Sequence, residues 1–185
     1  MNPVPLIEII VEENRKLLNN VPKEAVDRFI QAIDKAEKIF CAAQGRSGHI
    51  LRSFCMRLMH FGYQAFFVGE TITPKIGRKD IMIVLSGSGQ TLLTYELINL
   101  GRKRGARAYG LVGVENSPIA HALDYFICLP GGSKGGPPEQ SVSIQPPGSL
   151  FEQAAFILLE TIALTIYQRC GSDPQAILDR HTNLE

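Results

Sequence analysis

A short run of hydroxyl-bearing residues and glycines has the composition of an anion-binding loop. It reads Ser86-Gly87-Ser88-Gly89-Gln90-Thr91 and stands between an apolar run at 81–85 and a helical stretch at 92–103. Glycines let the backbone approach an anion closely, and the start of a helix directs unpaired N–H groups toward it. Each hydroxyl can donate a further hydrogen bond. The run predicts a phosphate-binding loop, and the alternative is a serine-rich turn that only caps the helix.

A second loop repeats this arrangement earlier in the chain. Gln44-Gly45-Arg46-Ser47-Gly48 follows an apolar run at 39–43 and leads into a helix predicted over 50–61. Because parallel strands place their carboxyl ends at one edge of a sheet, both loops can face the same ligand. Arg46 could then pair with phosphate or sugar oxygens, although an ordinary surface cation explains it about equally well.

Neither loop fits the two common nucleotide-binding motifs. A P-loop places lysine before Ser or Thr, and the run at 86–91 contains no lysine. A dinucleotide-binding fingerprint closes the first strand and needs a third glycine, whereas Leu92 stands at that position. Hydroxyls and amides without a lysine suit a phosphate monoester better than a diphosphate.

Five short apolar runs must position these loops, at 39–43, 64–68, 81–85, 106–112 and 125–129. The segments between them are long enough for a crossover or a helix. Strands that alternate with helices predict an α/β fold whose parallel sheet is covered on both faces. The third run shows no polar alternation, as expected of a central strand buried on both sides.

The remaining segments predict helices at both ends of the chain. Apolar residues recur at helical spacing over 6–18, and Pro22 opens a second helical stretch. A strongly apolar helix is predicted from Ser149 to about Arg169, and a short one from Asp173-Pro174 to His181. The glycine- and proline-rich stretch at 130–148 excludes regular helix or central strand, so we expect a long loop there.

Composition restricts the class of partner. The 185 residues, 45% hydrophobic and 20% charged, suit one globular domain rather than a disordered chain. The 19 Lys and Arg against 18 Asp and Glu give a formal net charge of +1, so no broad field draws in nucleic acid or an anionic bilayer. The basic run at 102–107 complements the end of a helix, and His60, opposite the apolar face of the helix at 50–61, is expected at the surface or at a subunit contact. The expected partner is a small, locally recognised ligand.

Cysteine spacing and hydropathy predict a cytoplasmic protein. The four cysteines form no Cys-x-x-Cys pair and have no histidine at a zinc-ligand spacing, so we expect buried thiols in a reducing cytosol and no metal site. The first residues lack the pattern of a signal peptide. The longest apolar stretch, 154–167, is interrupted by a glutamate and falls short of the ~20 residues of a bilayer span, so no membrane association is expected.

The two loops together resemble the SIS (sugar isomerase) domain of phosphosugar-binding proteins. Four further segments resemble, in the same order, the 6-phospho-3-hexuloisomerase family within it: MRLMHFG at 56–62, VGETITP at 68–74, GSLFE at 148–152 and RHTNLE at 180–185. The resemblance covers nearly the whole chain from about residue 39 onward. The last two segments distinguish this family from other SIS proteins.

The resemblance implies both a fold and an activity. The fold would be a three-layer αβα sandwich with a five-stranded parallel sheet, the flavodoxin-like SIS fold, as one domain over 1–185 with helices at 3–36 and 149–183 packed on its core. The activity would be a cofactor-free interconversion of D-arabino-hex-3-ulose 6-phosphate and fructose 6-phosphate, in the ribulose monophosphate route of formaldehyde fixation. Family members form homotetramers, which implies sites at subunit interfaces.

That reaction moves a carbonyl from carbon 3 to carbon 2 through an enediol, and it needs a base that removes a proton from carbon 2 and returns one to carbon 3. A carboxylate partly removed from water suits this task, and Glu152 is the candidate, matching the family's proposed base. His181 is the candidate that moves a proton between the enediol oxygens. The resemblance implies that the C-terminal segment carrying His181 reaches a neighbouring subunit. From position alone, Ser149-x-x-Glu152 is a capping box and His181 a cation at a helix end.

Two other functions stay open from the sequence. SIS domains also serve as non-catalytic phosphosugar sensors in transcriptional regulators, although no basic helix-turn-helix module accompanies the domain here. An aldose–ketose phosphate isomerase of the same fold would use similar parts, because a fold does not dictate its substrate.

Overall fold

The computed structural model describes residues 3–131, 142–171 and 173–184. Five strands form one all-parallel sheet in the order β2-β1-β3-β4-β5. The strands are β1 (Ile39–Ala43), β2 (Ala65–Phe67), β3 (Ile81–Ser86), β4 (Arg107–Val112) and β5 (Tyr125–Cys128). The predicted α/β fold and its five parallel strands are confirmed.

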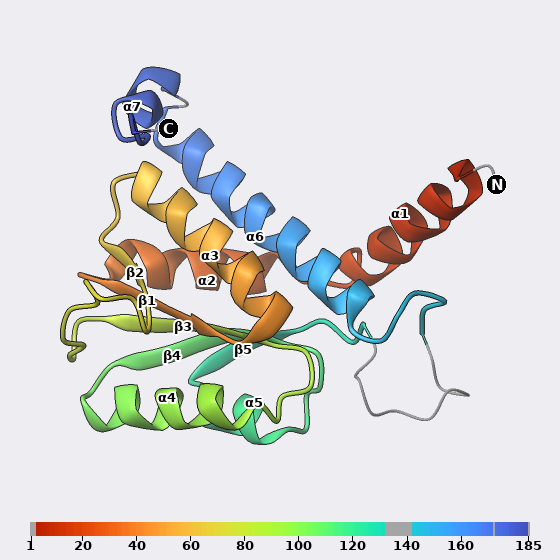
Figure 1. Cartoon of the computed structure of the whole chain (residues 1–185), viewed down its shortest axis with the longest axis horizontal. Coiled ribbons are helices and arrows are strands. Elements are labelled where there is room, and N and C mark those ends of the chain that lie inside the picture. The colour runs from red at the N-terminus through yellow and green to blue at the C-terminus, as the bar shows by residue number, and fades with distance from the viewer. Residues whose placement is uncertain (1–2, 132–141, 172, 185) are drawn as a thin grey trace.

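Helices cover both faces of the sheet and complete three layers (Figure 1). On one face lie α2 (Lys23–Lys35), α3 (Gly45–His60) and α6 (Ser149–Arg169), and on the other lie α4 (Leu92–Lys103) and α5 (Pro118–Ala122). β3 supplies both cores by simple alternation, since successive side chains of a strand point to opposite faces. Its odd-numbered residues join the core under α2, α3 and α6, and Met82 and Val84 join the core under α4 and α5.

Two more helices lie at the ends of this body. α1 (Val4–Leu18) packs against the first turns of α6 and projects away from the sheet, whereas α7 (Pro174–Leu178) lies near the opposite end of α6 and contacts α3. The side chain of Asp173 caps α7 by accepting from the Gln175 N–H at 2.9 Å, as predicted. The helix ends at Leu178, so His181 lies beyond it.

The apolar helix α6 has the bounds that the sequence predicts, Ser149 to Arg169. It runs for 21 residues with a mean hydropathy of 1.5 in its most apolar window, which meets the length and composition of a membrane span. However, 56% of that window is buried inside the protein, and residues such as Leu158 and Ile162 belong to the main core. These are the properties of a central core helix.

Two local predictions need correction, and a third falls mostly outside the described residues. α3 begins at Gly45, not at Ile50, so the Gly-Arg-Ser-Gly segment forms its first turn. Cys41 and Cys55 are buried, but Cys128 is only partly so and Cys170 is exposed, because it follows the end of α6 beyond the core. Most of the predicted loop at 130–148 falls in 132–141, outside the described residues.

Candidate functional site

The loops that follow β1 and β3 meet at the carboxyl edge of the sheet. These strands are direct neighbours, paired from Ile39–Ile81 to Ala43–Leu85. After β1 the chain crosses to α3 on one face, and after β3 it crosses to α4 on the other. Open α/β sheets bind ligands in the crevice at such a switch point. The topology therefore brings both predicted phosphate loops to the same ligand-binding position.

The two loops and the start of α6 line one cavity of about 150 Å³. Its lining residues are Gln44, Gly45, Arg46, Ser47, Gly87, Ser88, Thr91, Gly148, Phe151 and Glu152. Pockets for whole small molecules usually have volumes of about 300–1,000 Å³. The cavity of a single chain is thus large enough for one end of a sugar phosphate rather than for the whole molecule.

The three hydroxyls of the serine loop have different positions. Ser86 is buried, and its Oγ accepts a hydrogen bond from the Gly89 N–H at 3.2 Å and lies 3.3 Å from the Thr91 Oγ1. Ser86 therefore shapes the loop from behind, whereas Ser88 and Thr91 face the cavity. Of the other predicted binding residues, Gly89 and Gln90 lie outside the lining.

Two glycines of this loop are required by close packing. A Cβ on Gly87 would lie 2.9 Å from the Phe151 ring, so α6 can approach the loop only because that side chain is absent. Gly89 has φ of +65°, and a Cβ there would lie 2.1 Å from the Ser117 Oγ. The loop is thereby held in a fixed shape between α6 and the segment after β4.

Glu152 lies at the start of α6 and faces the cavity. It is only 6% exposed, and its Oε2 accepts a hydrogen bond from the Arg46 Nε at 2.5 Å. The capping-box alternative is wrong, because the N-cap is Gly148 in the left-handed conformation and Ser149 already belongs to the helix. Arg46 itself is 68% exposed, so one partner of this pair is held in the protein and the other can move.

This arrangement combines an anion cradle with a buried carboxylate. Hydroxyls of Ser47, Ser88 and Thr91, together with the N–H groups of the loops, can bind a phosphate group, and Arg46 adds a mobile positive charge. Glu152 is the sole carboxylate in the described lining of the cavity and can act there as a base. Within the described ranges no three His, Cys, Asp or Glu side chains are placed to hold a metal ion, and the cofactor-free reaction stays a prediction.

His181 is far from Glu152 within the same chain. Its ring stacks on that of His60, the last residue of α3, with 4.9 Å between ring centroids. Arg46 and His60 are fourteen residues apart on α3, which is about 21 Å at the usual rise per residue. A single chain therefore does not bring His181 to the Glu152 cavity, and its proton-transfer role stays a prediction that depends on a neighbouring chain.

His60 is a buried residue that the sequence places wrongly. Helical periodicity predicts it at the surface or at a subunit contact, yet it is 3% exposed because the C-terminal tail covers the end of α3. Its Nδ1 has no hydrogen-bond partner among the described residues. Burial, with His181 and Arg57 nearby, lowers the pKa of His60 from its ordinary value of 6.5.

This lowered pKa makes stability depend on pH. Between the folded and unfolded pKa values the unfolded chain binds more protons, so the free energy of unfolding is undiminished above about pH 6.5 and falls as the pH drops below it. Replacing His60 by glutamine should flatten this fall between pH 7 and pH 5 in urea unfolding. The control is His121→Gln, at an exposed histidine. An equal pH dependence in the wild type and H60Q would refute the link.

Three residues of the cavity were not predicted as site residues. Gln44, Gly148 and Phe151 adjoin predicted ones within the segments at 44–48 and 148–152. Their membership of these two segments is the signal that could have identified them. Periodicity alone could not, because Phe151 also belongs to the main core.

Known proteins resemble the chain along almost its entire length. The SIS domain model matches residues 32–147. A 3-hexulose-6-phosphate isomerase of Bacillus subtilis (strain 168) is 34% identical over 185 residues, covering 96% of this chain and 98% of that protein. The protein of the same name from Mycobacterium gastri is 32% identical over 179 residues, covering 97% and 89%.

A solved structure agrees with these sequence matches. It is the crystal structure of a hypothetical protein from Methanococcus jannaschii, for which a 3-hexulose-6-phosphate isomerase function is inferred. It matches with a TM-score of 0.85 and 33% identity, over 98% of this chain and 99% of that one. The resemblance indicated by the loops and the four further segments is confirmed.

Proposed function

The chain belongs to the SIS domain family, and we propose that within it the protein interconverts D-arabino-hex-3-ulose 6-phosphate and fructose 6-phosphate without a cofactor. The observation that carries this proposal is the buried Glu152 carboxylate beside a phosphate-sized cavity between two hydroxyl- and glycine-rich loops. The names of the relatives support the substrate. We place the reaction in the cytoplasm, in the ribulose monophosphate route of formaldehyde fixation.

The phosphate of the substrate binds to the serine loop. Ser88 and Thr91 donate hydrogen bonds from their hydroxyls, and the start of α4 adds N–H groups and a partial positive charge. Ser86 supports the loop from behind rather than contacting the ligand. Binding at one end fixes the orientation of the sugar, so its reacting carbons extend toward α6 and Glu152.

Glu152 is the base in this mechanism. Its carboxylate takes the proton from carbon 2 of the hexulose phosphate, electrons move toward the carbonyl oxygen at carbon 3, and an enediol results. A proton then passes between the two enediol oxygens, and Glu152 returns a proton to carbon 3. One carboxylate on one face of the sugar serves both transfers.

Arg46 links substrate binding to the availability of this base. In the structure its guanidinium neutralises Glu152, but an incoming oxyanion competes for the same positive charge. When the guanidinium turns toward the developing negative oxygen of the substrate, it stabilises that charge and leaves the carboxylate free to accept the proton. The exposed, long side chain of Arg46 suits this exchange of partners.

A neighbouring subunit completes the site in this proposal. The cavity of one chain is too small for the whole substrate, and the chain's own His181 lies at the far end of α3. We therefore assign the proton transfer between the enediol oxygens to His181 of an adjacent copy in a homotetramer. Catalysis then requires assembly.

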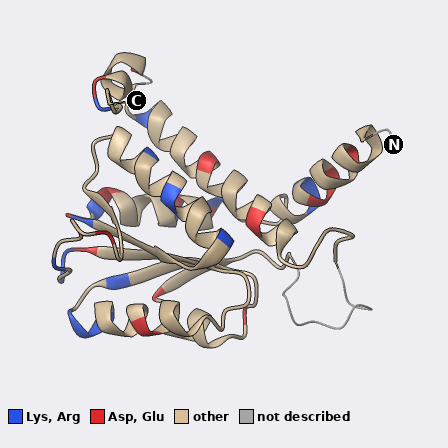
Figure 2. Ribbon diagram, in the orientation of Figure 1, with Lys and Arg blue, Asp and Glu red and all other residues tan. Residues whose placement is uncertain are grey.

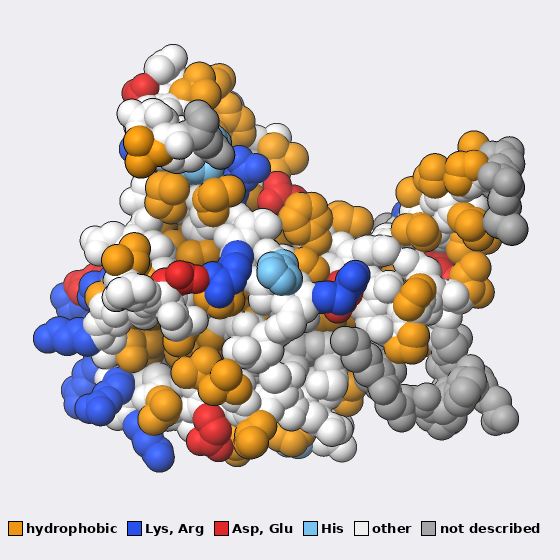
Figure 3. Space-filling view, in the orientation of Figure 1, with side chains coloured by type: hydrophobic (Ala, Val, Ile, Leu, Met, Phe, Trp, Pro, Cys, Tyr) orange, Lys and Arg blue, Asp and Glu red, His pale blue; other side chains and the backbone are white. Residues whose placement is uncertain are grey.

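Uncovered apolar surface on α1 and α6 supports such assembly. A groove of about 460 Å³ runs between the two helices and is lined mainly by apolar side chains, among them Val11, Phe156 and Ile157, which are 60%, 42% and 42% exposed. Figure 3 shows hydrophobic side chains gathered over the projecting α1. Exposed apolar patches of this kind are typical of protein–protein contacts.

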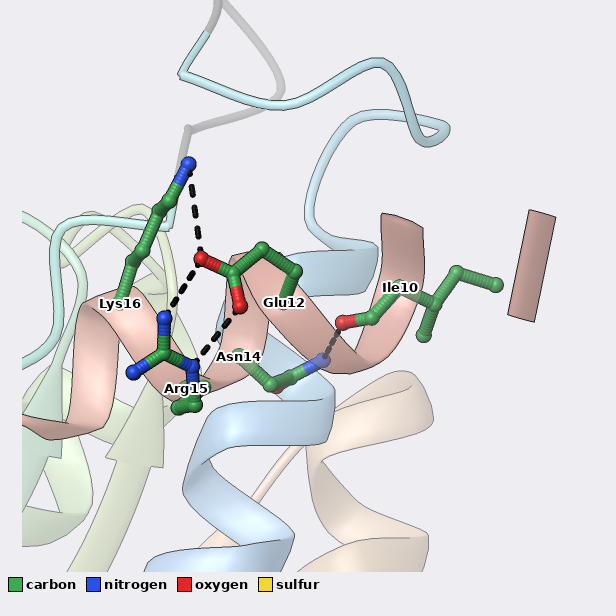
Figure 4. A network of polar contacts seen from close by, with 5 residues as sticks. All are labelled: Ile10, Glu12, Asn14, Arg15 and Lys16. Atoms are coloured by element: carbon green, nitrogen blue, oxygen red, sulfur yellow. Dashed lines mark hydrogen bonds and ion pairs between the residues drawn. The ribbon is translucent and has the colours of Figure 1, made fainter. Parts of the chain in front are cut away.

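Polar contacts lie within α1 and join it to α6. The Asn14 Nδ2 donates to the Ile10 carbonyl at 2.9 Å, and Glu12 pairs with Arg15 and Lys16 (Figure 4). Asn14 also donates to the Gln153 Oε1 at 2.8 Å, which ties α1 to α6. A second copy of the chain is the occupant that we propose for the groove.

Conversion of the substrate tests the proposal. Hex-3-ulose 6-phosphate is supplied to the pure protein without added metal or nucleotide, and carbon-13 NMR follows the appearance of fructose 6-phosphate. Catalytic conversion is the expected result. Tight binding of the sugar phosphate with no product would instead identify a phosphosugar sensor and overturn the isomerase proposal.

A further inference from the structure

A second, larger hollow lies at the opposite edge of the sheet, where the strands begin. It has a volume of about 490 Å³ and is formed by the end of α2 and by residues that precede or begin β1, β3 and β4. β3 spans six residues, so about 20 Å of sheet separates this hollow from the Glu152 cavity. The hollow is therefore a separate place on the molecule, and its volume is in the range of small-molecule sites.

Positive charge is concentrated in this hollow. Its lining holds five cations, Arg28, Lys35, Arg78, Lys79 and Arg107, against two acids, Glu37 and Asp80. Five minus two gives a local charge of +3, whereas the whole chain carries +1. Figure 2 shows Lys and Arg gathered at this edge of the sheet, on the left of the view. The hollow attracts small anions.

Most of these cations have no carboxylate partner. Lys79 is paired with Glu37 at 2.6 Å, and the Arg28 guanidinium lies over the Tyr125 ring, 4.2 Å from its centroid. Lys35, Arg78 and Arg107 form no ion pair within the part of the chain that the structure describes. By contrast, the nearby Arg102 bonds to the Ala122 carbonyl and pairs with Asp124. The charge in the hollow is thus left uncompensated.

The buried carboxylate in the wall of the hollow, Asp80, has partners within its own chain. Asp80 is 4% exposed, and its Oδ2 accepts from the Gly77 N–H at 2.7 Å. Its Oδ1 accepts no hydrogen bond among the described residues, and Lys38 Nζ lies 3.7 Å away. The Oδ1 is fully buried and faces Lys38, which does not line the hollow, so Asp80 balances the charge of Lys38 rather than that of the lining cations.

We propose that the hollow binds a small phosphorylated molecule. Lys35, Arg78 and Arg107 hold the phosphate. The concave shape of the hollow and the two acids in its lining disfavour an extended polyanion such as nucleic acid. Sugar phosphates and nucleoside monophosphates share this chemistry, so the test must distinguish them.

Calorimetric titration of the full-length protein at low ionic strength tests the proposal. The probes are AMP and fructose 6-phosphate. Because fructose 6-phosphate also binds the Glu152 cavity as the product of the proposed reaction, the binding event of this hollow is the one that a change in the hollow weakens and a change in the other cavity leaves intact. We expect one or both probes to show such an event, and whichever does identifies the source. Replacing Arg107 by glutamine should weaken this binding about tenfold, the effect of losing one charge-assisted hydrogen bond.

Two control variants assign the binding to this hollow. Arg104→Gln removes a neighbouring exposed cation outside the lining, and Ser88→Ala changes the other cavity, so both should keep this binding event. R107Q should keep the wild-type kcat and KM for isomerisation, because the two sites lie far apart. If neither probe shows a binding event that R107Q weakens and Ser88→Ala leaves intact, the proposal is overturned.

Discussion

Replacing Glu152 by glutamine is expected to reduce kcat for isomerisation about a thousandfold, the usual contribution of a general base. Glutamine has nearly the same shape and can still accept a hydrogen bond from Arg46, but it cannot take a proton from carbon. The loops that bind the phosphate are unchanged in this variant, so KM should change little. Steady-state kinetics with hex-3-ulose 6-phosphate measures both quantities.

A matched control separates loss of the base from damage to α6. Glu160 lies on the same helix, is partly exposed and does not line the cavity, so Glu160→Gln should retain wild-type kcat. The melting temperature of E152Q should stay close to that of the wild type, because the exposed Arg46 can be solvated by water when the ion pair is lost. Full turnover in E152Q would remove Glu152 from the mechanism.

Mixed assemblies of two inactive variants are expected to regain activity. In the proposed tetramer, the base comes from one chain and His181 from its neighbour. A site that combines Glu152 of a H181Q chain with His181 of an E152Q chain is then fully wild type. Random assembly of equal amounts should restore about a quarter of the sites, since each position is correct half of the time.

Co-expression of the two variants with different affinity tags makes this measurement practical. Tandem purification selects assemblies that contain both chains, and their kcat is compared with that of each variant alone. Activity in the mixed assemblies well above both single variants supports a shared site. If the mixture is as inactive as its components, His181 acts within its own chain or plays no part in the reaction.

The sheet could be predicted from the sequence because strand signals were strong and local. Each strand is a short apolar run, and β3 is apolar from Ile81 to Leu85 because both of its faces are buried. Helix boundaries were harder to predict. The segment at 45–48 contains two glycines, which favour a loop on propensity, yet tertiary packing makes it the first turn of α3. His60 was misplaced because a tail more than a hundred residues away covers it.

The candidate site was predictable at the level of loops but not of atoms. Parallel strands place their carboxyl ends together, so two loops after two strands had to share an edge. Which hydroxyls face the ligand depends on the turn within the loop, and Ser86 turns inward whereas Ser88 does not. The pairing of Arg46 with Glu152 joins residues 106 positions apart, and no local pattern signals it.

Deuterium exchange into fructose 6-phosphate tests most directly whether this protein moves a carbonyl between carbons 2 and 3. The sugar phosphate is incubated with the protein in D₂O and followed by proton NMR. The proposed enediol requires removal of the proton at carbon 3, so its signal should disappear while both protons at carbon 1 remain. Exchange at carbon 1 would indicate an aldose–ketose isomerase. The absence of both exchange at carbon 3 and any hex-3-ulose 6-phosphate would contradict the account.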